Sequence, residues 1–359
     1  MPRKTVYDGN VEYLQILTPD GELDEELLEF ELDDDFLVNF YKKMKKVRVL
    51  DEKALKLQRQ GRLGTYAPCK GQEACQVGSI LAIEDKDFIF PSYRESGVFM
   101  TRGIPIEHIL LYWGGDERGN TELRPHRVFP VSIPVGSQPI HAVGAMKANT
   151  IQDKHNVAIT YFGDGSTSEG DMLESMNFAG VWDTPVLFFC QNNQWAISVP
   201  REDQTASETL AQKSHAFGFD GVQIDGNDPL IVYQTVKQVR ETMVEEATPY
   251  FIEAITFRRG DHTTADDASK YRTEQEEEKW IERDPLKRTR TYLEKNGVWD
   301  EDREQQLEEE CEREIEKGVE AYEDYEKPDP GDIFQYTYEE MTSPLEQQYE
   351  SFLQEKTSE

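Results

Sequence analysis

Long apolar stretches are missing from this sequence. No run of about 18 consecutive apolar residues occurs, so we expect no membrane-spanning helix. The first residues contain no apolar signal core, so we do not expect export. Both absences favour a cytoplasmic protein.

Cysteine is scarce, and its spacing does not fit a metal site. The chain has four cysteines, and Cys69 and Cys75 have neither a second pair nor a histidine cluster nearby. This pattern argues against a zinc motif. We interpret all four as reduced thiols in a reducing compartment, with Cys190 in the core.

Positive charge is also in short supply. The sequence has 39 basic and 71 acidic residues, which gives a formal net charge of −32. Such a chain repels nucleic acid and anionic membranes, so we expect neither as a partner. The acids are densest after Glu274, and we hypothesise a protein that works in a high-salt cytoplasm, where self-repulsion is screened. The alternative is an ordinary acidic protein.

The organisation of the chain indicates one large α/β domain. Its 359 residues can bury one large core, and residues 36–330 contain no Pro/Ser-rich linker. We therefore predict an N-terminal arm at 1–34, the domain with its C-terminal helices at 35–330, and a tail at 331–359. Asp33 to Asp35 offer an N-cap for a helix that begins near Phe36.

Strand-like and helix-like segments alternate through the middle of the chain, which is typical of a doubly wound parallel sheet. We expect helices at 207–217 and 230–247 and after 274, and a turn-rich loop over the site at 114–129. The expected strands are 87–91, 157–162, 186–190, 221–225 and 250–257.

Polar residues follow two of these strands directly. The strand at 157–162 ends in Gly163-Asp164-Gly165, and the strand at 186–190 ends in Asn192-Asn193. Because parallel strands end at one edge of a sheet, Asp164 and Asn193 should meet there. Glycines allow the backbone to approach a ligand, the next helix N-terminus favours an anion, and oxygen ligands suit Mg²⁺. Alone, Gly-Asp-Gly is usually just a turn; followed by 26 residues and Asn-Asn, it is far more specific.

This arrangement resembles the thiamine-diphosphate motif. Together with Ser92-Tyr93-Arg94-Glu95 and the segment from Arg258, it resembles the alpha subunit of the decarboxylating component of 2-oxo acid dehydrogenase complexes, over about residues 36–330. The resemblance implies a mainly parallel thiamine-diphosphate-binding fold with helical extensions. It also implies thiamine diphosphate and Mg²⁺ as cofactors.

The resemblance assigns roles to particular residues. Arg94 and Tyr93 would contact the diphosphate, since a guanidinium pairs two phosphate oxygens and a phenol donates one more hydrogen bond. Val135 would lie under the bent cofactor. The implied cofactor-binding residues are Tyr93, Arg94, Val135, Asp164, Gly165, Ser166, Gln191, Asn193 and Trp195; the implied metal ligands are Asp164, Asn193 and the carbonyl of Trp195.

Among the histidines, His262 matches the residue at the mouth of the family's active site. It is suited to passing a proton to a lipoyl sulfur, so we expect a catalytic role. Thr263 falls where some relatives carry a regulatory phosphoserine, and we assign it no regulation. Ser137 and Gln138 match a monovalent-cation loop of some relatives.

The activity that follows from the resemblance is oxidative decarboxylation of pyruvate with reductive acylation of a lipoyl group. Branched-chain 2-oxo acids are the alternative substrates. The chain is too short to hold a pyrimidine-binding domain as well, so a beta subunit should complete the site in a heterotetramer. A lipoyl-bearing dihydrolipoyl acyltransferase would accept the acyl group. An alternative of another class is a non-catalytic diphosphate-binding scaffold.

Overall fold

A six-stranded sheet forms the centre of the molecule, in a computed structural model that describes residues 3–356. The strand order is β1-β7-β8-β4-β3-β2, and every neighbouring pair is parallel. The strands are β1 (Tyr13–Leu14), β2 (Phe88–Phe90), β3 (Ala158–Gly163), β4 (Val186–Asn192), β7 (Gly221–Asp225) and β8 (Tyr250–Ile255). A separate two-stranded hairpin joins β5 (Trp195–Ala196) to β6 (Val199–Pro200). The predicted doubly wound fold is confirmed.

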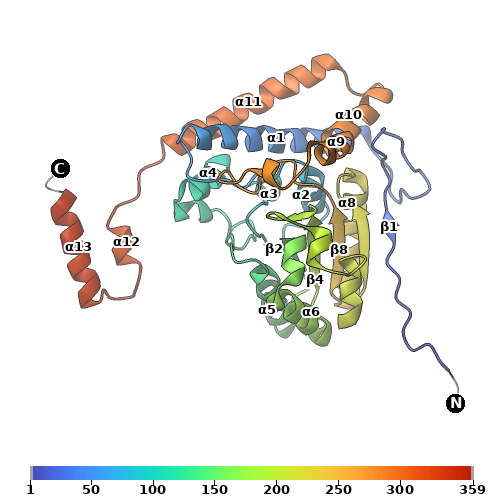
Figure 1. The fold of residues 1–359 in the computed structure, drawn as a ribbon, viewed down its shortest axis with the longest axis horizontal. Coiled ribbons are helices and arrows are strands. Elements are labelled where there is room, and N and C mark those ends of the chain that lie inside the picture. The colour runs from blue at the N-terminus through green and yellow to red at the C-terminus, as the bar shows by residue number, and fades with distance from the viewer. Residues whose placement is uncertain (1–2, 357–359) are drawn as a thin grey trace.

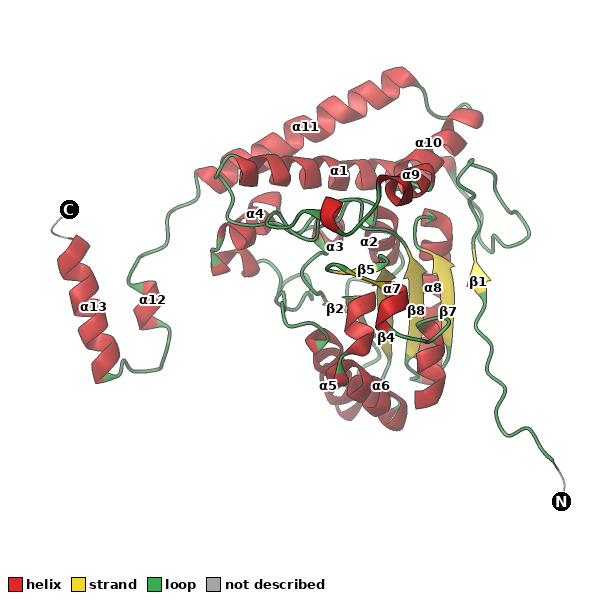
Figure 2. Cartoon of the chain, in the orientation of Figure 1, coloured by secondary structure: helices red, strands yellow, loops and turns green. Residues whose placement is uncertain are grey.

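Helices cover both faces of this sheet, as Figure 2 shows. In the first half of the chain they are α1 (Asp34–Arg59), α2 (Glu73–Leu81), α3 (Ser96–Arg102), α4 (Ile106–Gly114), α5 (Ser137–Ile151) and α6 (Gly170–Trp182). In the second half they are α7 (Arg201–Gln204), α8 (Pro229–Glu246), α9 (Glu274–Glu282), α10 (Pro285–Lys295), α11 (Glu301–Glu323), α12 (Asp332–Gln335) and α13 (Ser343–Lys356). Four 3-10 helices complete the set: η1 (Glu117–Asn120), η2 (Asp164–Ser168), η3 (Ala211–Phe217) and η4 (Ala268–Lys270).

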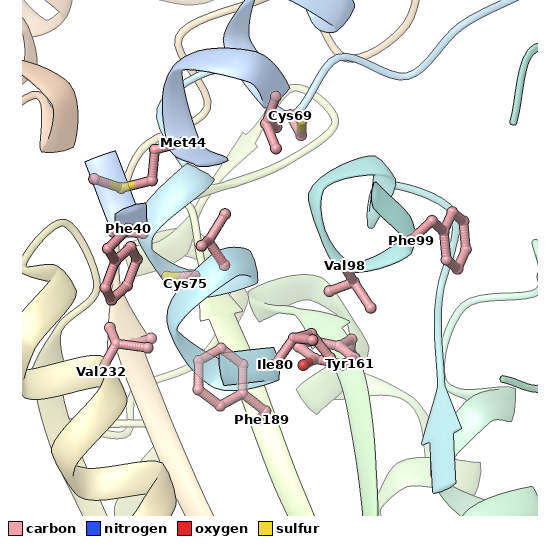
Figure 3. Close-up of a cluster of buried hydrophobic side chains, with 14 of the residues drawn as sticks. Phe40, Met44, Cys69, Cys75, Ile80, Val98, Phe99, Tyr161, Phe189 and Val232 are labelled. Carbon is pink, nitrogen blue, oxygen red and sulfur yellow. The ribbon is translucent and has the colours of Figure 1, made fainter. Parts of the chain in front are cut away.

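Alternating side chains of the strands point into two separate cores. Ile159 and Tyr161 of β3 pack in a large cluster with α1, α2 and α8. Ala158 and Phe162 of the same strand pack in a smaller cluster with α5 and α6. Figure 3 shows part of the larger cluster, in which Tyr161 and Phe189 of the sheet lie near Ile80 of α2. Layers of helices on both faces explain why the strands read as continuous apolar runs.

Helix α1 begins where the sequence predicts. The side chain of Asp33 accepts a hydrogen bond from the amide of Asp35 at 3.2 Å, and acidic residues occupy the first turn. Along its buried face lie Phe40, Met44 and Val47, at helical spacing. Helix α11 runs beside α1 (Figure 1), and lysines of α1 form ion pairs with glutamates of α11, such as Lys45 with Glu304 at 2.9 Å.

One expectation about helices needs correction. The helix expected at 207–217 is only the short η3, which begins at Ala211, because Leu210 and Ala211 donate their amides to Glu253 of β8 instead of continuing a helix. After residue 331 the chain forms α12 and α13, which stand apart from the body in Figure 1. Residues 1–2 of the predicted arm and 357–359 of the predicted tail lie outside the described residues. None of the described helices is both long and apolar enough to cross a membrane.

Candidate active site

A cavity of about 560 Å³ opens at the carboxyl ends of the central strands. Its walls come from the segments that follow β2, β3, β4 and β8, which the parallel register brings to one edge of the sheet. All ten residues predicted for the site line this cavity: Tyr93, Arg94, Val135, Asp164, Gly165, Ser166, Gln191, Asn193, Trp195 and His262. The structure therefore brings together residues that lie up to 169 positions apart in the sequence, from 93 to 262.

Asp164 lies where β3 passes into η2, and it is 2% exposed. Its Oδ2 accepts a hydrogen bond from Gln204 Nε2 at 2.7 Å, whereas its Oδ1 has no partner among the described residues. Burial raises the pKa of this carboxyl group. A buried carboxylate oxygen without a partner is costly, and a cation beside it would remove that cost.

Asn193 lies across from Asp164, after β4. Its Oδ1 accepts from the amide of Trp195 at 3.3 Å, and its Nδ2 donates to Gln72 at 3.3 Å. The part of the chain that the structure describes has no group of three His, Cys, Asp or Glu side chains that could hold a metal. Asp164 and Asn193 nevertheless fit Mg²⁺, which usually takes one or two protein ligands and completes its shell with phosphate and water.

The turn after β3 needs a glycine because another loop approaches it closely. A Cβ added to Gly165 would lie 2.8 Å from the Cβ of Ala196 in β5. The neighbouring hairpin is itself unusual, since Ile197 has φ of 56°, a left-handed conformation that β-branched residues rarely adopt. Such strain at a cavity wall persists only when surrounding contacts enforce it.

Two buried arginines converge on the cavity without carboxylate partners. Arg94 donates to the carbonyl groups of Pro68 at 2.6 Å and His262 at 3.0 Å. Arg258, 1% exposed, donates to the carbonyl groups of Trp195 at 3.3 Å and Ile197 at 2.8 Å. Within residues 3–356, neither guanidinium forms an ion pair with a carboxylate. Burial and the charge of Arg94 lower the pKa of Arg258 to about 10, so it stays protonated at neutral pH.

His262 lies between these two cations. Its Nδ1 is 3.1 Å from Arg94 Nη2 and 3.4 Å from Arg258 Nη1. Burial, followed by the charges of Arg94 and Arg258, lowers the pKa of His262 to about 4. The imidazole is therefore neutral at pH 7, and its main-chain amide donates to Asp266 at 2.8 Å.

The remaining predicted residues differ in how they face the cavity. Gln191 is 2% exposed and donates to Glu95, whereas Val135 is 45% exposed. The Tyr93 ring lies under the guanidinium of Arg94, with 5.5 Å between the Arg94 Cζ and the ring centroid. The carbonyl of Trp195, expected to face a metal, accepts a hydrogen bond from Arg258, and the Trp195 indole donates to Glu276 at 3.0 Å.

Sequence reasoning missed several cavity residues, chiefly Arg258 and Glu95. Arg258 comes shortly after a buried strand, which is the same signal that identifies Asn193, and this signal could have found it. The loop expected over the site at 114–129 is a wrong prediction. No residue of this loop lines the cavity, because it packs against α4; the neighbouring Trp113 lines it instead.

Comparison with known proteins gives matches over most of the chain. The family described as "Dehydrogenase E1 component" matches residues 41–331. The 3-methyl-2-oxobutanoate dehydrogenase subunit alpha of Mycobacterium tuberculosis is 39% identical over 350 residues, 97% of this chain and 95% of that protein. The pyruvate dehydrogenase E1 component subunit alpha of Staphylococcus epidermidis is 41% identical over 347 residues, 96% and 94% of the two chains. The same subunit of Staphylococcus aureus is 40% identical over 347 residues, with the same coverage. The chain belongs to the dehydrogenase E1 component family.

Proposed function

We propose that this chain is the alpha subunit of the decarboxylating component of a 2-oxo acid dehydrogenase complex, with pyruvate as its substrate. The observation that carries the proposal is one cavity that contains two arginines without carboxylate partners and a buried aspartate oxygen without a partner. In a chain with a net charge of −32, such a cavity is suited to an anion held together with a cation.

Thiamine diphosphate with Mg²⁺ fits this donor set. Arg94 and Arg258 would neutralise the diphosphate, and Asp164 and Asn193 would hold the metal. The chemistry that the coenzyme supplies when bound is the stabilisation of negative charge on the carbon that loses carbon dioxide. The protein contributes binding, orientation and the exclusion of water from a site whose polar residues are mostly buried.

His262 is the proposed proton carrier of the site. In the chain by itself the imidazole is neutral, because burial and then the charges of two flanking guanidinium groups lower its pKa. A bound anion that offsets those two charges would raise the pKa of His262 toward its ordinary value, near the working pH of a general acid. In this proposal His262 passes a proton to the sulfur of the lipoyl acceptor.

The choice of substrate rests on the relatives. Those named pyruvate dehydrogenase are 40–41% identical to this chain, and those named 3-methyl-2-oxobutanoate dehydrogenase are 39% identical. We propose pyruvate, with branched-chain 2-oxo acids as the second candidates, since the two groups of relatives are nearly equally similar.

The proposal includes a beta subunit, with which the chain forms a heterotetramer, and a lipoyl-bearing acyltransferase. The relatives are named as subunits of dehydrogenases. Three apolar side chains that line the cavity are also strongly exposed: Ile133 at 52%, Val135 at 45% and Ile197 at 55%. Exposed apolar residues around a cavity support its closure by a partner.

Reduction of ferricyanide by the assembled alpha and beta subunits tests this function. We expect turnover with pyruvate that exceeds turnover with 3-methyl-2-oxobutanoate. Asp164→Ala should lower the affinity for thiamine diphosphate by at least about 100-fold, because it removes a charged ligand of the metal. Asp171→Ala, an exposed change on α6, is the matched control and should leave the affinity unchanged. Absence of decarboxylation with every 2-oxo acid would favour a scaffold instead.

A further inference from the structure

Glu95 is a cavity residue to which the proposed function gives no task. It lies between β2 and α3, lines the cavity and is 1% exposed. Its Oε2 accepts from the amide of Arg94 at 2.9 Å, and its Oε1 accepts from Gln191 Nε2 at 2.8 Å. In the described part of the chain, no side-chain cation pairs with it. A fully buried carboxylate held only by neutral donors retains most of its desolvation cost.

The orientation of Gln191 is fixed from behind by Gln76 of α2. Gln76 Nε2 donates to the carbonyl of Arg94 at 3.0 Å and to Gln191 Oε1 at 3.1 Å, and Gln76 Oε1 accepts from the amide of Gly97 at 2.9 Å. Because two backbone groups determine which end of Gln76 faces which way, Gln191 must present its NH₂ group to Glu95. The amide of Gln191 therefore cannot rotate to accept a hydrogen bond from Glu95.

The charges around Glu95 offset its own charge only in part. The nearest cation is Arg94 on its own loop, but that guanidinium is directed to Pro68 and His262. Tyr161 of β3 interacts electrostatically with Glu95, and Asp51 of α1 is linked to the next residue, Ser96, through Tyr66. The other titratable groups of the cavity are Asp164, Arg258 and His262. Burial raises the pKa of Glu95 to about 7, against the smaller opposing effect of Arg94.

We propose that Glu95 takes up a proton from solvent when a diphosphate group enters the cavity. This inference rests on the proposed function. One proton converts the carboxylate to the neutral acid, and no other bond changes. As a carboxylate Glu95 would repel the anion, whereas as an acid it no longer does and can donate a hydrogen bond. Binding of the coenzyme and protonation of Glu95 are thus coupled, and each favours the other.

Titration calorimetry in two buffers with different protonation enthalpies measures this coupling. The assembled alpha and beta subunits are titrated with thiamine diphosphate in excess Mg²⁺ at pH 7. Wild type should take up roughly half a proton more than Glu95→Gln, because a carboxyl group with a pKa of about 7 is half ionised there. The affinity of wild type should also fall about tenfold more than that of the variant between pH 6 and pH 9. Wild type must be compared with the variant because the phosphate groups of free thiamine diphosphate also titrate and contribute to the measured proton uptake.

Gln191→Arg makes a second, independent test. A guanidinium beside Glu95 would hold it ionised, so this variant should lose the extra proton uptake although the carboxyl group remains. Glu304→Gln is the matched control, since Glu304 is a buried glutamate of α11 that pairs with Lys45 away from the cavity. This control should take up as many protons as wild type.

Several outcomes would overturn the inference. Equal proton uptake by wild type and Glu95→Gln would do so while leaving the proposed function intact, whereas absence of thiamine diphosphate binding to wild type would remove both. Should Glu95→Gln not fold, infrared difference spectra of wild type decide. Adding magnesium pyrophosphate should produce the band of a protonated carboxyl group, and its absence would refute the uptake of a proton by Glu95.

Discussion

The two most deeply buried arginines of the described chain, Arg288 and Arg258, are held in opposite ways. Arg288 Nη1 pairs with Asp225 at 3.0 Å and also donates to the carbonyl of Leu17 at 2.8 Å. Among the described residues Arg258 has no carboxylate partner: it donates to carbonyl groups and the hydroxyl of Tyr271, and its Nη1 lies 3.4 Å from His262 Nδ1. A carboxylate within the fold neutralises the charge of the first arginine, whereas the second, next to Arg94, leaves excess positive charge on a cavity wall.

This difference indicates how to separate a structural buried charge from one that awaits a ligand. Both arginines are desolvated, and desolvation costs several kcal/mol per ion. Around Arg288 the cost is offset by a carboxylate that ties the N-terminal arm to β7, since Asp225 also accepts from Gln15. Around Arg258 the described residues offer no such partner, and in the proposed function the bound diphosphate offsets the cost.

The largest effect on stability is expected when Asp225, the carboxylate partner of Arg288, is replaced. Asp225→Asn leaves Arg288 buried beside a neutral amide, so we expect a loss of about 3–5 kcal/mol in the free energy of unfolding. Urea denaturation measures it, with the exposed change Asp302→Asn on α11 as the control. A loss no larger than that of the control would mean that the pair has no structural role.

Replacing each arginine by methionine tests whether only Arg288 stabilises the fold through a carboxylate. Arg288→Met should cost about 2–4 kcal/mol, because it leaves Asp225 with a single cation, Arg283, whose side chain is 34% exposed. Arg258→Met should change stability by less than about 1.5 kcal/mol, since no carboxylate loses its partner. The same variant should bind thiamine diphosphate about 10- to 100-fold more weakly. Equal losses of stability in the two variants would contradict the distinction.

Salt should change the contribution of the charged surface to stability but not that of the buried pair of Arg288 and Asp225. Because the chain carries a net charge of −32, molar KCl should screen its self-repulsion and raise the free energy of unfolding by about 2 kcal/mol. The difference between wild type and Asp225→Asn should be unaffected, since screening hardly reaches buried pairs. Thermal unfolding at low and molar KCl checks both statements. Unchanged stability of wild type would remove the high-salt hypothesis.

The smallest expected effect on stability comes from His262, whose pKa is lowered by burial and by Arg94 and Arg258. Its pKa is about 4 in the folded chain and about 6.5 in the unfolded chain. The unfolded state therefore binds this proton first as the pH falls from 6.5 to 4, and the contribution of His262 to stability falls over that range. Partial exposure limits the slope to less than about 1 kcal/mol per pH unit. His262→Asn should remove this slope in denaturation curves at pH 7 and pH 5; an identical slope would show that His262 is not the group responsible.

Much of the fold and the candidate site could be predicted from local sequence signals. Continuous apolar runs gave the central strands, and the residues just after them, Asp164 and Asn193, meet because parallel strands end together. The partners of Arg258 could not be predicted, because Trp195 of the β5–β6 hairpin and Tyr271 after η4 come from segments that no sequence periodicity relates to it. The contact between Glu95 and Gln191, 96 positions apart, likewise depends on Gln76 of α2, which donates a hydrogen bond to Gln191 of β4.

The wrong prediction for the turn-rich segment 114–129 has a similar cause. Its composition correctly indicates irregular structure, but composition carries no information on which surface the loop covers. In the fold a Cβ at Gly119 would lie 2.5 Å from the carbonyl oxygen of His108, so the loop is held tightly against α4. Composition could not have revealed this close approach.

Both margins of the central sheet are short. On one side β1 offers two residues to β7, and on the other β2 has three residues, with a bridge from Ile89 to Val128 beside it. A margin of this length exposes few unpaired N–H and C=O groups to another molecule. Strand addition between copies, the usual first step of sheet aggregation, thus finds little template here, a protection that is independent of the acidic surface.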